Sequence, residues 1–163
     1  MPVFWSDTES VLYVHVPKTG GSSVEAHFLG AKYDFSFLIT KHSPIFTPMR
    51  CSPQHYHAAM IDVIFDTSKF DLVLMTVRHP VSRIISEYKM RCPEGRHPEK
   101  WIEEGFEKYI ENSYIFDNHL RPQREFFVEG AKVFKLEDGF CDEWVKSVNR
   151  HLDRKLEVRS FHK

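Results

Sequence analysis

Near the start of the chain, one short segment combines a cation, two glycines and three hydroxyl side chains. Its members are Lys18, Thr19, Gly20, Gly21, Ser22 and Ser23. The segment follows an apolar stretch at residues 11–16, which predicts a strand, and opens a predicted helix at residues 22–29. Glycines let the backbone approach a ligand, and the N–H groups and dipole of a helix N-terminus attract anions. The segment therefore predicts a loop that binds a phosphate-like or sulfate-like group.

The order of these residues differs from the P-loop of proteins that bind nucleoside triphosphates. That motif reads G-x-x-x-x-G-K-[ST], with the lysine after the last glycine, whereas here Lys18 precedes Gly20 and Gly21. A single glycine loop also fits an ordinary strand-to-helix turn with a surface lysine. A second segment of the chain is needed to decide between these interpretations.

That second segment begins with the near-continuous apolar run at residues 72–77, which is typical of a strand buried on both faces. The run ends directly in Arg78, and Pro80 is well suited to the start of the helix predicted at residues 81–90. Ser86 then lies about two turns into this helix. Because open α/β sheets bind ligands at the carboxyl ends of their strands, Arg78 and Ser86 predict a site for a second phosphate.

Taken together, the two segments resemble the sulfotransferase family 2 group, which includes carbohydrate sulfotransferases and small bacterial relatives. Residues 17–23 look like the 5′-phosphosulfate loop of that family. The pattern Arg78-x-Pro80-x-x-Arg83-x-x-Ser86-x-Tyr88 looks like its 3′-phosphate motif. The resemblance implies an enzyme that transfers a sulfuryl group from 3′-phosphoadenosine 5′-phosphosulfate (PAPS) to a hydroxyl of a carbohydrate or small metabolite.

The resemblance also implies a division of roles among the residues. Residues 19–23 would hold the 5′-phosphosulfate, and Arg78 and Ser86 would hold the 3′-phosphate. Lys18 would bind the phosphosulfate and stabilise the charge that develops on the departing phosphate. No metal is expected, because Lys18 and the helix end carry the required charge.

The acceptor hydroxyl must lose a proton, and a histidine ahead of the Arg78 strand is the expected base. His55 and His57 are the candidates. Small members of the resembled family carry His-x-[Thr/Ser]-Ala here; aligning Ala58 with that alanine places the base at His55, and places His57 where a hydroxyl residue is usual. A metal site formed by Cys51, His55 and His57 is a further interpretation, although no second cluster has zinc-finger spacing.

Three other polar residues near these motifs have weaker predictions. His15 lies on the first predicted core strand, where we expect it to be packed rather than catalytic. Arg83 either assists at the 3′-phosphate or forms a surface ion pair. Gln123 resembles a family residue that contacts substrate, and otherwise is a polar residue at a helix end.

Composition frames these predictions. A chain of 163 residues with 42% hydrophobic and 28% charged residues predicts one globular domain spanning residues 1–163. The net charge of −1 and the lack of a Lys/Arg cluster argue against a nucleic-acid partner. Residues 1–7 show no signal-peptide pattern, and no apolar stretch reaches the length of a membrane span. We therefore expect a cytoplasmic protein.

Predicted strands and helices alternate along the chain. Strands are expected at residues 11–16, 72–77 and 131–136, with a short edge strand at 33–40, and helices at 22–29, 54–65, 81–90, 99–110 and 142–152. This alternation predicts a three-layer α/β fold, with a mainly parallel sheet flanked by helices. Such a fold is similar to that of the P-loop nucleoside triphosphate hydrolases.

Two other functions fit part of these observations. A nucleotide-dependent kinase of the P-loop type would use a similar sheet, but the Gly-Lys-Ser/Thr order and a strand ending in a magnesium-binding aspartate are missing. A non-catalytic module that binds PAPS, or its desulfated product PAP, would keep Arg78 and Ser86 and would need no base.

Overall fold

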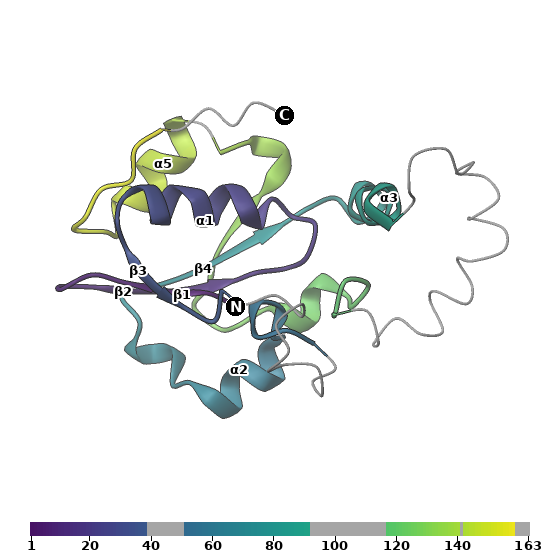
Figure 1. Cartoon of the computed structure of the whole chain (residues 1–163), viewed down its shortest axis with the longest axis horizontal. Helices are drawn as coiled ribbons and strands as arrows, with labels where there is room; N and C mark the ends of the chain where they lie inside the picture. The colour runs from purple at the N-terminus through teal and green to yellow at the C-terminus, as the bar shows by residue number, and fades with distance from the viewer. Residues whose placement is uncertain (39–50, 92–116, 141, 159–163) are drawn as a thin grey trace, which may run out of the picture.

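The computed structural model describes residues 1–38, 51–91, 117–140 and 142–158. Within them, five strands form a sheet in the order β3-β1-β2-β4-β5. The strands are β1 (Val3–Trp5), β2 (Ser10–Val14), β3 (Asp34–Ser36), β4 (Leu72–Val77) and β5 (Lys132–Lys135). The helices are α1 (Gly21–Gly30), α2 (Ala58–Ile64), α3 (Pro80–Arg91) and α5 (Asp142–Asn149), with short 3₁₀ turns that include η2 (Pro53–His55) and η4 (Gln123–Phe126). α1 and α5 cover one face of the sheet and α2 lies on the other (Figure 1), which makes three layers.

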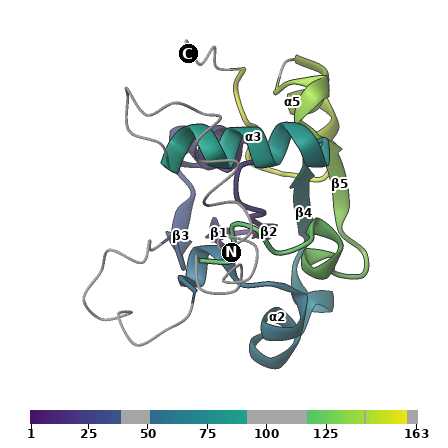
Figure 2. The same cartoon turned by 90° about the vertical axis from the view of Figure 1, so that its right-hand side faces the viewer.

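Strand direction decides where the predicted motifs meet. β2, β4 and β5 are parallel neighbours, and Val14 of β2 is paired with Met75 of β4. The loops that follow β2 and β4 therefore leave the same edge of the sheet. α3 lies beyond this edge, off the carboxyl end of β4 (Figures 1 and 2).

The sheet is mixed rather than mainly parallel, which corrects part of the fold prediction. β1 pairs antiparallel with both β2 and β3, so the parallel arrangement is confined to β2, β4 and β5. The strand at Val3–Trp5 was not predicted, because three residues are too few to show a hydrophobic period. The predicted edge strand at residues 33–40 is confirmed as the shorter β3.

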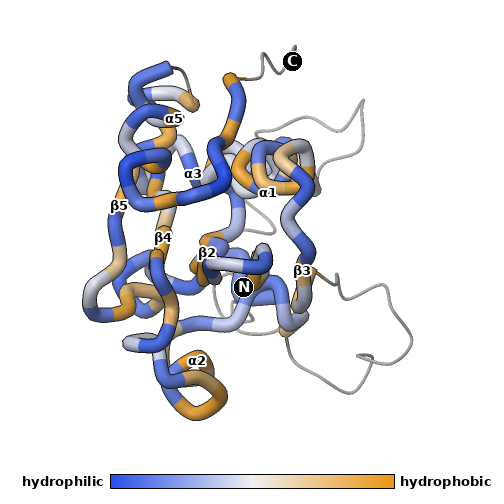
Figure 3. Tube along the Cα trace, turned by 90° about the vertical axis from the view of Figure 1, so that its left-hand side faces the viewer, coloured by the Kyte–Doolittle hydropathy of each residue, from blue (hydrophilic) through white to orange (hydrophobic). Residues whose placement is uncertain are grey.

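The alternation of side chains along β2 and β4 divides the core in two. Leu72 and Leu74 of β4 pack with Phe28 of α1 and Trp144 of α5 on one face of the sheet. Val73 and Met75 pack with other apolar side chains, including Ile61 of α2, on the opposite face. Burial of both faces explains the continuous apolar run of β4. Hydrophobic residues are also concentrated on α2 (Figure 3).

Two helices have features that the sequence did not predict. The helix predicted at residues 54–65 begins only at Ala58, because residues 53–55 form a 3₁₀ turn that starts at Pro53. In α3, Ile84 and Ile85 are exposed, whereas the charged residues Arg83 and Glu87 are buried. The helix predicted at residues 99–110 lies outside the described residues.

None of the helices in the described ranges is both long enough and apolar enough to cross a membrane.

Candidate active site

A cavity of about 1160 Å³ opens at the edge of the sheet where β2 and β4 end. Every predicted site residue except Thr19 lines it: Lys18, Gly20, Gly21, Ser22, Ser23, His55, Arg78 and Ser86. This volume is slightly above the range for small-molecule sites, about 300–1,000 Å³. The cavity can therefore hold a nucleotide together with part of a second ligand.

Two residues with a left-handed backbone conformation and one buried hydroxyl shape the loop after β2. Lys18 has φ 66° and Gly20 has φ 86°. The Oγ1 of Thr19 donates to the carbonyl of Val16 at 2.7 Å and lies 2.9 Å from the Oγ1 of Thr76 on β4. The Thr19 hydroxyl is thus used to hold the loop against the sheet, and only its backbone remains for the predicted anion contact.

The first turn of α1 faces the cavity without a side-chain cap. Gly20 is the N-cap residue, and no side chain at this position caps the N–H groups of the first turn. A Cβ added at Gly21 would lie 2.0 Å from the Nε2 of His15, so only glycine fits there. The His15 ring can approach this closely because residue 21 has no side chain. The N–H groups at the start of the helix offer a site for an anion.

Arg78 is positioned through its backbone by Gln123. The N–H of Arg78 donates to Oε1 of Gln123 at 2.9 Å, and Nε2 of Gln123 donates to the Arg78 carbonyl at 2.7 Å. Gln123 thus holds the residue that follows β4, which is a positioning role that the sequence did not predict. Nη1 of Arg78 lies 3.5 Å from the carbonyl of Lys18, so the guanidinium reaches toward the loop after β2.

Arg83 is buried, with an exposed fraction of 6%, so the surface ion pair, one of the two alternatives for this residue, is wrong. Its Nε donates to the carbonyl of Pro17 at 2.9 Å. Its Nη1 and Nη2 donate to the carbonyls of Arg121 and His119 at 2.9 and 2.6 Å. Arg83 therefore ties the loop after β2 to residues 119–121.

His55 forms a buried pair with Asp117. The Nδ1 of His55 lies 2.8 Å from Oδ2 of Asp117. Burial lowers the pKa of His55 to about 3, against the opposing effect of the carboxylate. Burial also acts to raise the pKa of Asp117, but hydrogen bonds from His55 and from Ser52 outweigh it and hold that pKa at about 2. At neutral pH the pair is a neutral imidazole beside an ionised carboxylate, with Nε2 as the ring nitrogen that Asp117 does not engage.

A model of the sulfotransferase family matches residues 1–133. The chain belongs to the sulfotransferase family. The matched residues include the loops after β2 and β4 as well as the His55–Asp117 pair. A search of curated proteins and a search of solved structures each found no match.

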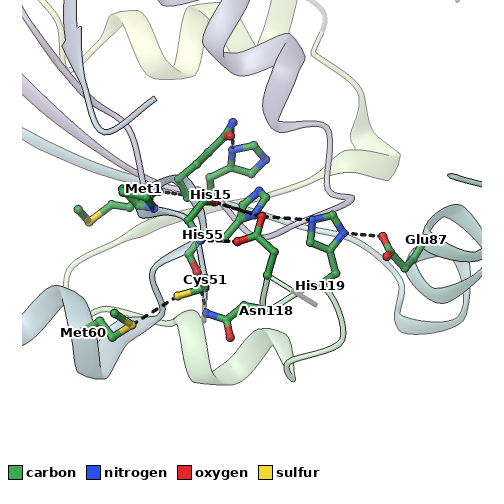
Figure 4. Close-up of polar contacts among 12 residues, drawn as sticks. Met1, His15, Cys51, His55, Met60, Glu87, Asn118 and His119 are labelled. Carbon is green, nitrogen blue, oxygen red and sulfur yellow. Dashed lines mark hydrogen bonds and ion pairs between the residues drawn. The ribbon is translucent and has the colours of Figure 1, made fainter. Parts of the chain in front are cut away.

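In this sulfotransferase-family chain, two further histidines flank His55 in the cavity wall (Figure 4). The ring centroids of His15 and His119 each lie 4.9 Å from that of His55. Each is also paired through Nδ1 with a buried carboxylate, His15 with Glu25 at 2.6 Å and His119 with Glu87 at 2.6 Å. His15 is packed, as expected, but it also lines the cavity.

His57 lies away from this cluster. It is the N-cap residue of α2, is only partly buried, and does not line the cavity. Of the two candidate bases, the structure therefore brings only His55 to the cavity. Among the described residues, the group with the spacing of metal ligands consists of His55, Asp117 and His119, rather than Cys51, His55 and His57.

Proposed function

We propose that this sulfotransferase-family chain transfers the sulfuryl group of PAPS to a hydroxyl of a carbohydrate or small metabolite. The observation that carries the proposal is the convergence of three groups on one cavity: the glycine loop with Lys18, the Arg78–Ser86 pair, and the carboxylate-paired His55. The family match supports sulfuryl transfer as the reaction class. The strand–loop–helix unit β2–α1 beside the parallel strand β4 supports a P-loop-like arrangement of the fold.

The donor would bind along the edge of the sheet. Backbone N–H groups at residues 19–21 and the hydroxyls of Ser22 and Ser23 would hold the 5′-phosphosulfate at the start of α1. The guanidinium of Arg78 and the hydroxyl of Ser86 would hold the 3′-phosphate. Two anions bound at two strand ends fix the donor at both ends, which orients its sulfur toward the remaining part of the cavity.

Transfer would proceed by in-line displacement at sulfur. The acceptor oxygen forms a bond to sulfur while the bond between sulfur and the bridging phosphate oxygen breaks, and PAP leaves. Nε2 of His55 accepts the proton of the acceptor hydroxyl, and Asp117 holds the ring in the tautomer that makes this possible. Lys18 stabilises the negative charge on the departing bridging oxygen.

One contact favours an enzyme over a module that only binds PAP or PAPS. A module that only binds the nucleotide needs no base, whereas a general base is helped by a carboxylate that fixes its tautomer, and His55 has this partner within the cavity wall. A kinase is disfavoured because this chain has no lysine after the last glycine of the loop. In addition, β4 is followed by Arg78 rather than by a magnesium-binding aspartate.

The donor can be tested by thermal unfolding with PAPS, PAP or magnesium–ATP. We expect PAPS and PAP to raise the melting temperature, because a ligand at 100 times its Kd stabilises by about 2.7 kcal/mol, and each kcal/mol corresponds to roughly 2–4 °C for a chain of this size. Magnesium–ATP should have little effect. A shift with magnesium–ATP alone would overturn the proposal and favour the kinase.

A further inference from the structure

We propose that His55, Asp117 and His119 form a binding site for a divalent cation of the zinc class, and that its occupation prevents His55 from acting as a base. The second half of this inference rests on the function proposed above. The first half concerns binding alone and does not depend on any catalytic activity.

The spacing of the three side chains is suited to a single ion. One ligand atom from each lies within 4.8 Å of the others. His55 and Asp117 are buried, and the side chain of His119 is 11% exposed. Oδ2 of Asp117 lies 2.8 Å from Nδ1 of His55 and 4.0 Å from Nε2 of His119. Zinc–nitrogen and zinc–oxygen bonds of about 2.0–2.2 Å in a tetrahedral site place neighbouring ligand atoms roughly 3.3 Å apart. Small side-chain movements would therefore complete the site.

Glu87 prepares His119 for this role. Its Oε2 lies 2.6 Å from Nδ1 of His119, and Glu87 is 1% exposed. A carboxylate that accepts the Nδ1 proton leaves Nε2 with its lone pair, and this Nε2 is the nitrogen nearest to Asp117. A metal-ligating histidine typically has such an outer partner, which fixes its tautomer and raises its basicity. Figure 4 shows His119 between Glu87 and the His55 side of the cluster.

The site also has an outer partner for its carboxylate and an opening for a fourth ligand. Both the backbone N–H and the hydroxyl of Ser52 donate to Asp117. His55 and His119 line the cavity, so a water molecule can reach an ion held between them. Three protein ligands plus water is the usual arrangement of an open zinc site.

Cation binding and base catalysis compete for the same imidazole. As a base, His55 carries its proton on Nδ1, toward Asp117, and offers the lone pair of Nε2 to the acceptor hydroxyl. When Nδ1 donates its lone pair to a cation, the ring proton lies on Nε2, after exchange with water. Nε2 is then a hydrogen-bond donor that cannot accept a proton. The cation would therefore inhibit transfer without blocking the anion sites at Lys18 and Arg78.

Calorimetric titration of Zn²⁺ into the metal-free full chain tests the site directly. We expect one ion to bind per chain. His119→Gln should weaken binding by more than the roughly 10–100-fold typical of an outer-shell change, and Glu87→Gln should weaken it by about that range. His57→Gln is the matched control, because His57 lies in the same segment as His55 but outside the cluster, and it should bind Zn²⁺ like the wild type. Melting curves without metal verify that each variant is folded.

Two results would overturn the inference: a folded wild type that binds no Zn²⁺, or binding that His119→Gln and Glu87→Gln leave unchanged. Failure of the proposed function has a different signature, because metal-free protein would then transfer no sulfuryl group while zinc binding persisted. In active enzyme, Zn²⁺ should abolish transfer and leave PAP affinity within about twofold, and a chelator should restore transfer. Transfer that persists with the site saturated would refute the inhibitory part.

Discussion

The two sides of the cavity handle charge in different ways. On one side, which we call the anion side, Lys18, residues 20–23, Arg78 and Ser86 present cations, hydroxyls and a helix start to the cavity. On the other, the histidine side, His15, His55 and His119 are each paired with a carboxylate through Nδ1. The anion side is suited to holding a doubly anionic nucleotide, and the histidine side to handling a proton. Substitutions on the two sides should therefore separate affinity from turnover.

The largest effect is expected on the histidine side. His55→Ala should lower transfer by about 10²–10⁴-fold, the range for loss of a general base, while PAPS affinity stays nearly intact. Steady-state kinetics and calorimetry on the same preparation measure both quantities. His57→Ala is the control and should be much milder, because His57 does not line the cavity. A larger loss of transfer in His57→Ala than in His55→Ala would identify His57 as the base.

Lys18 tests whether the anion side also contributes to the transition state. Lys18→Ala should reduce turnover by about a hundredfold, the scale of losing one donor to a developing anion. Donor affinity should fall much less, and Lys18→Arg should recover part of the turnover because it restores the positive charge. If affinity collapses while turnover at saturating donor is kept, Lys18 is a binding cation only.

Arg78 tests the assignment of the 3′-phosphate. Arg78→Ala should weaken PAP binding by about 1.5–3 kcal/mol, the range for hydrogen bonds to a charged group. Binding of adenosine 5′-phosphosulfate, which lacks that phosphate, should hardly change. Calorimetry with both ligands makes the comparison. Equal losses of affinity for the two ligands would mean that Arg78 contacts a part of the donor other than the 3′-phosphate.

The last prediction concerns stability in acid rather than affinity or turnover. The pKa of His55 is about 3 in the folded chain, whereas about 6.5 is usual for an exposed histidine. Between these values the unfolded chain binds a proton that the folded chain does not. The stability contributed by neutral His55 is therefore complete above about pH 6.5 and is lost as the pH falls toward 3. Urea unfolding across this window should give a shallower pH dependence for His55→Gln than for the wild type; an identical slope would contradict burial of a neutral ring.

The same contrast explains which parts could be predicted from the sequence. Residues 17–23 and Arg78 follow strands closely, so local sequence places them, and the structure brings all of them except Thr19 to the lining of one cavity. The sequence gives no spacing that connects His55 with Asp117, or Glu87 with His119, because these partners meet only through the fold. Asp117 and His119 were consequently missed, although the histidine they support was found.

Two residues close to the anion side in sequence, Arg83 and Thr19, show a second reason for error. Arg83 donates to three backbone carbonyls, which no sequence pattern marks. The Thr19 hydroxyl could serve a ligand or a local carbonyl, and the fold uses it for Val16 and Thr76. The sheet was predicted in its parallel part because β4 is long and apolar, whereas β1 is too short to be recognised.

The measurement that tests the account most directly is transfer of label from PAPS carrying a radioactive sulfuryl group, with metal-free wild-type protein and a panel of carbohydrate and small-molecule alcohols. We expect labelled product from at least one acceptor, formed in equal amount with PAP, and loss of that product in His55→Ala. Protein that binds PAPS with both anion contacts intact, yet labels no acceptor in the panel, would contradict the account and identify the cavity as a binding site without chemistry.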